Sequence, residues 1–178
     1  TLEVVTESPL REGAPVTFRA TATDPGGDTL SYLFFFNNGI DPDVVAEDVN
    51  GTGAQTASFT YDNEGVYRVR LQVFDGTDYT ELEDYFSVSV ENAPPEISLD
   101  APVAPVLEGS EIRITGTISD PGNDRLTLRW DVGADDRIEA EAIGEDGVIE
   151  FSFIAPDDGE VNGQATVRAT VVDSADAE

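Results

Sequence analysis

The sequence predicts an all-β fold of two tandem sandwich modules. Apolar and polar residues alternate in short runs, clusters of Gly, Pro, Asn and Asp separate these runs, and the whole pattern occurs twice. Alternation with a period of two is typical of a strand that is buried on one face, and no helix of useful length is indicated. About seven short strands per copy, at this spacing, are typical of an immunoglobulin-like β-sandwich.

The internal repeat is clearest in its acidic turns. Glu12-Gly13 and Asp24-Pro25-Gly26-Gly27-Asp28 recur 96 residues later as Glu108-Gly109 and Asp120-Pro121-Gly122-Asn123-Asp124. Further matches are Phe34 with Trp130, Phe59 and Tyr61 with Phe151 and Phe153 at a spacing of 92, and Val69, Leu71, Val73 and Asp75 with Val167, Ala169, Val171 and Asp173 at a spacing of 98. The spacing changes in turn-rich stretches, as it does in surface loops. Two modules are therefore predicted, at residues 1–92 and 93–178.

Both modules contain the same alternating strands. The inward rows are Val16, Phe18, Ala20 and Ala22, then Tyr67, Val69, Leu71 and Val73, and in the second copy Ile112, Ile114 and Ile118, then Val167, Ala169 and Val171. Phe34 and Trp130 lie in the inward register of their strands, so each is expected to lead the core of its module. Between the modules, the prolines of Asn92-Ala93-Pro94-Pro95 stiffen the joint and predict a rod.

The second module is predicted to lack its final strand. The last strand of the first module covers residues 85–90, and the spacing of 98 places its counterpart at about residues 183–188, beyond Glu178. We expect the natural chain to continue and supply this strand, because an unpaired strand edge exposes backbone donors and acceptors. The alternative is that another chain donates a strand, with the segment from Leu2 to Thr6 as the donor.

Composition narrows the function. The net charge is -28, and it is shared evenly, with 17 acidic and 4 basic residues in the first module and 20 and 5 in the second. Such a surface repels phosphate groups and anionic lipids, so neither nucleic-acid binding nor membrane insertion is expected. The chain has no Cys and no Lys, which excludes disulfides and Lys-Asn cross-links. Stability must come from packing, backbone pairing or bound ions.

Several motifs resemble the polycystic kidney disease (PKD) repeat, an immunoglobulin-like sandwich. They are Glu-Gly before a strand, the Asp-Pro-Gly-Gly-Asp turn, the run from Tyr67 to Gly76, and Trp130-Asp131-Val132-Gly133 in the second copy. Glu91-Asn92-Ala93-Pro94-Pro95 is similar to the junctions of cadherin-like modules. The resemblance implies tandem extracellular arrays, as in adhesins, surface layers and the non-catalytic parts of secreted hydrolases.

A calcium site is predicted at the joint between the modules. The turns at one pole of the first module and at the opposite pole of the second would bring carboxylate and amide oxygens together, and these are the ligands that Ca²⁺ prefers. The predicted ligands are Glu12, Asp62, Glu64, Glu91, Asn92, Asp120, Asp124 and Asp173. The equivalent outer poles carry Asp24, Asp28 and Asp75 at the front and Glu108, Asp157 and Asp158 at the back. Two alternatives stay open, namely ordinary turn-forming Asp residues and the acidic surface of a halophilic protein.

An apolar patch is predicted on the first module. Leu33, Phe35, Phe74 and Tyr85 fall in the outward register of strands that share one sheet. An exposed apolar patch suggests contact with another chain, including a second copy, or with another domain. The alternative is that the longer loop between Asn37 and Phe59 folds over the patch.

Two further motifs carry less information. Asn50-Gly51-Thr52 is an N-glycosylation sequon on a predicted loop. Asp135-Asp136 and Asp157-Asp158 are paired carboxylates, but no nucleophile or cleft is indicated beside them, so no enzymatic activity is predicted.

The predicted function is therefore structural. We interpret the chain as non-catalytic, adhesive repeat modules of a secreted or cell-surface protein, which form a semi-rigid stalk stiffened by calcium and contact adjacent modules of the same chain. One alternative is an accessory pair that holds a secreted hydrolase against its substrate. Another is a segment of an extracellular filament.

Overall fold

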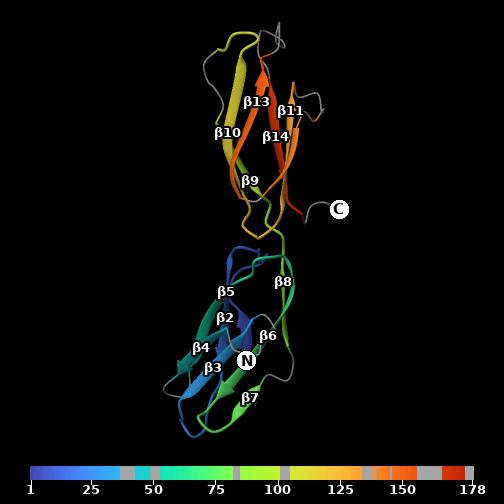
Figure 1. Ribbon diagram of the computed structural model, residues 1–178. Helices are drawn as coiled ribbons and strands as arrows, with labels where there is room; N and C mark the ends of the chain where they lie inside the picture. The colour runs from blue at the N-terminus through green and yellow to red at the C-terminus, as the bar shows by residue number, and fades with distance from the viewer. Residues whose placement is uncertain are drawn as a thin grey trace. The chain divides into compact units, whose positions relative to one another are not determined.

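A computed structural model describes residues 1–36, 43–48, 53–81, 85–100, 105–133, 138, 140–144, 146–155 and 166–174. The chain divides into two compact units, Thr1–Asn92 (unit 1) and Ala93–Glu178 (unit 2). Throughout the described residues every regular element is a β-strand, as Figure 1 shows. The predicted all-β fold is thus confirmed.

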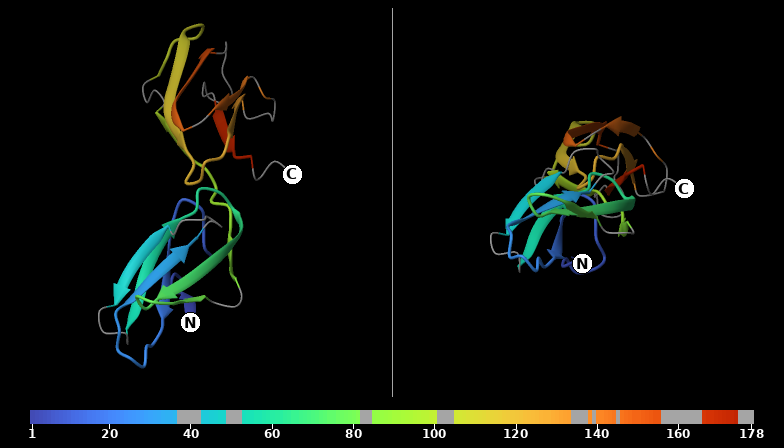
Figure 2. Two further views of the ribbon diagram at one scale, coloured as in Figure 1. Left: turned by 60° about the horizontal axis from the view of Figure 1, so that its bottom comes forward. Right: turned by 90° about the horizontal axis from the view of Figure 1, so that it is seen from below.

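Unit 1 is a sandwich of two antiparallel sheets. Its strands are β1 (Leu2–Val4), β2 (Pro15–Thr21), β3 (Leu30–Phe35), β4 (Val44–Asp48), β5 (Ala54–Thr60), β6 (Gly65–Phe74), β7 (Tyr79–Glu81) and β8 (Phe86–Val90). One sheet has the order β1-β2-β5, and the other has β4-β3-β6 with β7 and β8 both paired to β6 (Figure 2). Because β6 is long, β7 pairs with one part of it and β8 with another.

The core of unit 1 follows from the alternation of β2 and β3. Val16, Phe18 and Ala20 of β2 are buried, as are Leu30, Tyr32 and Phe34 of β3. The ring of Phe36 completes this layer, because its centroid lies 4.8 Å from that of Phe18, 5.8 Å from that of Phe34 and 5.1 Å from that of Phe59. Aromatic rings at such separations add to the stabilisation from buried area.

Unit 2 has the same arrangement of strands. They are β9 (Glu96–Asp100), β10 (Glu111–Ser119), β11 (Leu126–Val132), β12 (Ala140–Gly144), β13 (Gly147–Ile154) and β14 (Val167–Val172). The sheets have the orders β9-β10-β13 and β12-β11-β14, which repeat β1-β2-β5 and β4-β3-β6. Trp130 is buried and stacks on Phe151, with centroids 4.8 Å apart, so its predicted inward register is confirmed.

One predicted match between the copies is wrong by two residues. Val16 pairs with Phe59 in unit 1, and its counterpart Ile112 pairs with Phe153 in unit 2. The carbonyl oxygens of Tyr61 and Ala155 likewise accept equivalent bonds from Gly13 and Gly109. Phe59 therefore corresponds to Phe153, at a spacing of 94 instead of 92.

The strand edges of the two units bear on the predicted strand exchange. The Leu2–Val4 strand pairs with β2 of its own unit, so the donor predicted from Leu2 to Thr6 is already used there. Within the described residues of unit 2, β11 is the strand that pairs with β14. The predicted missing final strand stays a prediction.

Candidate cation site

Five of the predicted ligands gather at one pole of unit 1. We call this group the exit pole, and its members are Glu12, Asp62, Glu64, Glu91 and Asn92. Backbone bonds tie its segments together, because Glu12 N–H donates to Glu91 O at 3.1 Å and Glu91 N–H donates to Leu10 O at 2.8 Å. Arg11 Nη1 donates to Asn92 O at 2.6 Å, which fixes the end of the unit to the Glu-Gly turn.

The Glu-Gly turn of the exit pole has a backbone reason to recur in both units. Gly13 and Gly109 have φ angles of 67° and 72°, in a region that residues with a side chain rarely adopt. The acidic residues beside them differ, since Glu12 is buried and Glu108 is exposed. The repeat of the Glu-Gly motif is therefore explained by the glycine that the turn requires. The acidic side chain beside it is buried in unit 1 and exposed in unit 2.

Tyr67 reports the negative potential of the exit pole. Burial of the phenol raises its pKa, and the carboxylates of Glu64, Asp62 and Glu12 raise it further, in that order. The phenolic O–H donates to Asn63 O at 2.6 Å. These three carboxylates thus lie near one ring, at the pole to which the sequence assigned them.

Unit 2 has an acidic pole of its own, where β9 begins and β14 ends (Figure 1). The predicted ligands Asp120 and Asp124 lie in the turn between β10 and β11, and Asp173 follows β14. A fourth carboxylate, Asp146, lies in the turn between β12 and β13 and accepts a bond from Asp120 N–H at 2.8 Å. Asp120, Asp124, Asp146 and Asp173 are called the acidic pole from here on.

Asp120 is the residue of the acidic pole whose ionised form is most disfavoured by its surroundings. Burial raises the pKa of Asp120, and the nearby carboxylates of Asp124, Asp173 and Asp146 raise it as well, while a bond from Gly122 N–H to Asp120 Oδ1 at 2.9 Å opposes this rise. Asp120 is 7% exposed and Asp173 is 2% exposed. Asp120 Oδ2 is buried and has no hydrogen-bond partner among the described residues. Such an arrangement favours either a bound cation or a proton.

Asp146 was not among the predicted ligands. With the spacing of 94, its counterpart in unit 1 is Thr52, so the repeat contains no matching acidic residue that could have drawn attention to it. The available signal was the turn sequence Glu145-Asp146-Gly147, and turns of this kind are common without a metal.

The outer pole of unit 1 contains the counterparts of the acidic pole. Asp24 Oδ2 accepts a bond from Asp28 N–H at 2.9 Å, and Asp75 Oδ1 accepts bonds from Thr77 N–H and Asp78 N–H at 2.8 and 2.7 Å. The bonds from Asp78 and Thr77 lower the pKa of Asp75. In unit 1 the carboxylates of Asp24 and Asp75 therefore stabilise their own turns by accepting backbone hydrogen bonds.

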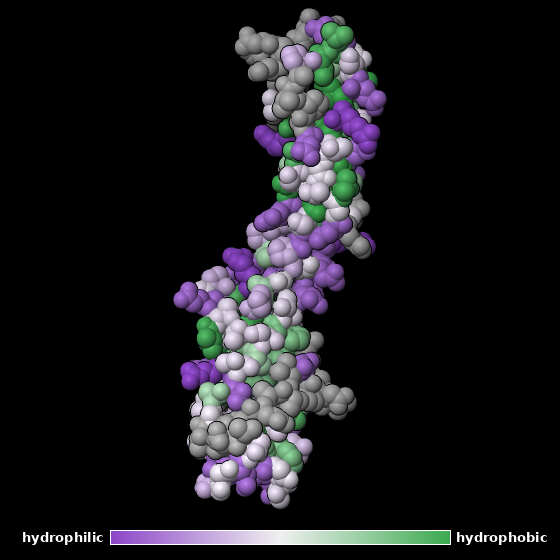
Figure 3. Space-filling view, turned by 90° about the vertical axis from the view of Figure 1, so that its left-hand side faces the viewer, coloured by the Kyte–Doolittle hydropathy of each residue, from purple (hydrophilic) through white to green (hydrophobic). Residues whose placement is uncertain are grey.

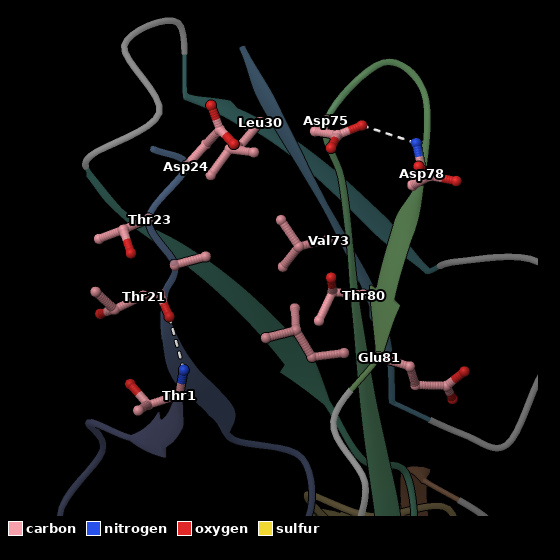
Figure 4. Close-up of a pocket in the computed structure, with 12 residues that line it drawn as sticks. Thr1, Thr21, Thr23, Asp24, Leu30, Val73, Asp75, Asp78, Thr80 and Glu81 are labelled. Atoms are coloured by element: carbon pink, nitrogen blue, oxygen red, sulfur yellow. Dashed lines mark hydrogen bonds between the residues drawn. The ribbon is translucent and has the colours of Figure 1, made fainter. Parts of the chain in front are cut away.

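A hollow of about 230 Å³ lies between the strands at this outer pole (Figure 4). Its lining residues include the apolar Leu71 and Val73 and the acidic Asp24, Asp75 and Asp78. Asp28 is not among its lining residues. The three predicted outer-pole residues thus do not converge on this hollow as one group.

The exit pole and the acidic pole belong to different units. The calcium site that would combine the two sets remains a prediction. Of the residues predicted elsewhere, Asn50, Asp157 and Asp158 lie outside the described residues.

The predicted apolar patch is corrected at Phe35, which is 2% exposed. The guanidinium of Arg70, the cross-strand partner of Phe35, lies 3.9 Å from the centre of its ring. Unit 2 has the same cross-strand pair with different chemistry, because Asp131 is buried and Arg168 approaches its carboxylate at 3.7 Å. An arginine thus covers the outward side of this strand in both units.

The rest of the patch is smaller than predicted. Leu33 and Phe74 are partly buried, and Phe74 stacks on Tyr79 with centroids 4.4 Å apart. Tyr79 is 60% exposed and Tyr85 is 58% exposed, with the guanidinium of Arg68 5.7 Å from the Tyr85 ring. On the face drawn in Figure 3, hydrophobic residues are interspersed with hydrophilic ones. Tyr79 and Tyr85 are therefore the exposed aromatic residues of this region among the described residues.

Comparison with known proteins identifies the family. The family model of the PKD domain matches residues 1–90, half of the chain. No curated protein matches the chain. Seventeen chains of solved structures match, among them the human OSCAR ligand-binding domain, with 15% sequence identity and a TM-score of 0.34 over 86% of this chain and 80% of that chain. No helix in the described part of the chain is long and apolar enough to cross a membrane. The match to the family model and the paired sandwich sheets of both units show that the chain belongs to the PKD domain family.

Proposed function

We propose that the chain is a non-catalytic section of a secreted or cell-surface protein, in which two PKD modules act as a spacer that calcium stiffens. The observation that carries this proposal is the short joint between two sandwiches with the same strand order. Strand β8 ends at Val90 and β9 begins at Glu96, and the joint contains Pro94 and Pro95. PKD and immunoglobulin-like domains are typically non-catalytic and usually extracellular.

Calcium is proposed because of the donor chemistry at the two ends of the joint. The exit pole would supply Glu12, Glu64 and Glu91, and the acidic pole would supply Asp120 and Asp173. Hard carboxylate oxygens in this number suit Ca²⁺, which accepts six to eight oxygen ligands. A bound ion would neutralise part of the charge and reduce the repulsion between the modules, so the joint would sample fewer orientations.

The test is small-angle scattering of the intact chain with chelator and with millimolar CaCl₂ at constant ionic strength. We expect a narrower distribution of interatomic distances and a higher melting temperature with calcium, because a ligand that binds only the native state stabilises it. The control uses the same ionic strength of NaCl, which reproduces general screening. Identical scattering and melting in NaCl and CaCl₂ would reject calcium stiffening and leave the acidic, halophilic explanation of the charge.

A second function is favoured by the exposed tyrosines. Tyr79 and Tyr85 lie on or beside the sheet that contains β6, and immunoglobulin-like and PKD domains mediate protein contacts. Exposed aromatic side chains supply much of the binding energy of protein surfaces. The chain would then hold an attached domain against its substrate.

Binding of the intact chain to insoluble polysaccharides and to fibrous proteins tests this second function. The double variant Tyr79→Ala, Tyr85→Ala should lose binding, whereas Val66→Ala, at another exposed apolar position, should keep it. Equal retention of all three proteins on every support would argue against an aromatic binding face.

A further inference from the structure

We propose that strand β13 of unit 2 is a contact surface for a second copy of this chain. The β13 strands of the two copies would pair antiparallel, with Phe151 at the centre of the pairing. Such a contact continues the β9-β10-β13 sheet of one copy into the same sheet of the other. It goes beyond the proposed spacer function, because it joins two chains through their strand edges and needs no calcium.

Strand β13 lies at the edge of its sheet. From Gly147 to Ile154 it pairs with β10 on one side, and no strand of the described residues pairs with its other side. The backbone N–H and C=O groups of an edge strand can pair with a strand from another chain. With 8 residues, β13 is long for an open edge, because proteins usually keep such strands short.

The outward row of β13 is unusually apolar for an edge strand. Val148 is 83% exposed and Ile154 is 61% exposed, with Glu150 and Ser152 between them in the same row. Glu150 forms an ion pair with Arg113 of β10, so the single charge of the strand is already partly neutralised. Proteins commonly protect an edge with lysine, proline or a bulge, and β13 contains neither lysine nor proline. This exposed apolar row is the observation that points to a partner.

Two other edge strands of this chain are polar where β13 is apolar. Strand β9, at the opposite edge of the same sheet, begins at Glu96 and ends at Asp100, and both residues are exposed. In unit 1 the counterpart of β13 is β5, whose exposed residues mostly carry hydroxyl groups, namely Thr56, Ser58 and Thr60. The apolar edge is therefore a property of unit 2 and not of the repeated fold.

One register makes β13 complementary to itself. With Phe151 opposite Phe151 of the second copy, Val148 lies opposite Ile154, and Glu150 lies opposite Ser152. Side chains directly opposite each other in an antiparallel pair contact each other, so the two exposed apolar residues cover each other at both ends. A shift of two residues one way would place Glu150 opposite Glu150, which is destabilising. The same shift the other way would leave Val148 beyond the end of the partner strand.

The inward row of β13 would gain burial in the same contact. Ile149, Phe151 and Phe153 are partly buried and pack against the core of unit 2. The ring of Phe151 stacks on the buried Trp130, with centroids 4.8 Å apart, so the centre of the pairing lies next to this core. A partner strand would cover the open side of these residues and add apolar burial to the backbone hydrogen bonds.

The net charge of -28 opposes association of two copies at low salt. Screening shortens the range of this repulsion from about 10 Å at 0.1 M salt to about 3 Å at 1 M, so the dimer should strengthen as NaCl is raised. Analytical ultracentrifugation of the intact chain measures the equilibrium over a series of protein concentrations at both salt concentrations. Chelator is present throughout, so that the proposed calcium joint makes no contribution. We expect a monomer–dimer equilibrium that shifts toward the dimer in 1 M NaCl.

Two lysine substitutions in the outward row of β13 should have opposite effects on the dimer. Val148→Lys removes an apolar contact at each end of the pairing and should weaken the dimer by about tenfold or more. Ser152→Lys places a cation opposite Glu150 of the second copy, twice in each dimer, and should strengthen it by about twofold or more. Ala54→Lys, at the counterpart of Val148 in unit 1, should show only the general effect of one added positive charge. Fluorescence of Trp130, the one tryptophan of the chain, verifies that unit 2 of each variant is folded.

The pattern across the three variants decides the outcome. Weakening by Val148→Lys together with strengthening by Ser152→Lys supports both the edge contact and its register. Equal weakening by these two variants would overturn the register. A dimer that ignores both would place the contact on another surface, and a chain that stays monomeric in 1 M NaCl would exclude the contact altogether.

Discussion

At the scale of single residues, the two units place different chemistry at the same cross-strand position. Phe35 with Arg70 in unit 1 corresponds to Asp131 with Arg168 in unit 2. A guanidinium can lie over an aromatic face or pair with a carboxylate, so one arginine can cover either neighbour. Exposure of an outward-facing residue therefore depends on its cross-strand partner as well as on its own register.

Asp75 gives a prediction for the pH dependence of stability. Because bonds from Asp78 and Thr77 lower its pKa in the folded state, its contribution is complete above the ordinary Asp pKa and is lost as the pH falls through the folded value. Asp75→Ala should therefore lower the free energy of unfolding most near neutral pH, and the difference from the parent should shrink in acid. Urea unfolding at several pH values measures this, with Asp78→Ala as the control for removal of a nearby charge. A difference that stays constant with pH would contradict the assigned role.

At the scale of elements, the close approach of β9 and β10 depends on Gly116. A Cβ atom at this position would lie 2.1 Å from Ser98 O and 3.0 Å from a methyl group of Leu99. Neighbouring strands in a sheet have little freedom to separate, so the side chain would force a local shift of the backbone. Sequence shows Gly116 only as an interruption of the inward row of isoleucines.

Gly116→Ala should therefore destabilise unit 2 by about 1 to 3 kcal/mol or more, the range typical of overpacking. Gly144→Ala is the matched control, because a Cβ there would meet no atom within 4 Å. It should be neutral or stabilise by about 0.4 to 1 kcal/mol through a less flexible unfolded chain. Denaturant unfolding followed by Trp130 fluorescence compares the two, and equal effects would contradict the close approach.

Trp130 tests the packing between the two sheets of unit 2. Its ring is buried against Phe151, and Ile114 and Leu128 belong to the same core. Trp130→Ala should reduce the free energy of unfolding by about 3 to 5 kcal/mol, as for other large buried side chains. Trp130→Phe should cost less, because an aromatic ring would still contact Phe151. Calorimetry measures both variants, and an unchanged melting transition in Trp130→Ala would contradict the buried position.

At the scale of the whole molecule, the net charge of -28 opposes folding through repulsion. Because screening shortens from about 10 Å at 0.1 M salt to about 3 Å at 1 M, the melting temperature should rise with NaCl. Added calcium at constant ionic strength should raise it again if the proposed calcium joint binds the ion. Thermal scans across NaCl concentrations, with and without chelator, measure the two contributions. A rise with NaCl and no further effect of calcium would assign the stabilisation to screening alone.

Much of the fold could be predicted because strand alternation is local. The inward rows of β2, β6, β10 and β14, and the buried Phe34 and Trp130, follow from a side-chain period of two. The family resemblance also depends on turn motifs that are contiguous in the chain. The acidic turns could be assigned to poles from the sequence because strand ends at the same edge of a sandwich bring their turns together, while their role as calcium ligands stays a prediction.

Tertiary structure alone decided the details that depend on pairing between strands. A shift of two residues keeps every side chain of a strand on the same face. The sequence repeat therefore could not decide whether Phe151 or Phe153 is the counterpart of Phe59. The pairing of β13 with β10 identifies Phe153. Likewise, Asp146 joins the acidic pole through the pairing of β10 with β13, and Phe35 is buried by an arginine from another strand. These outcomes come from contacts between residues distant in sequence, which a local pattern does not contain.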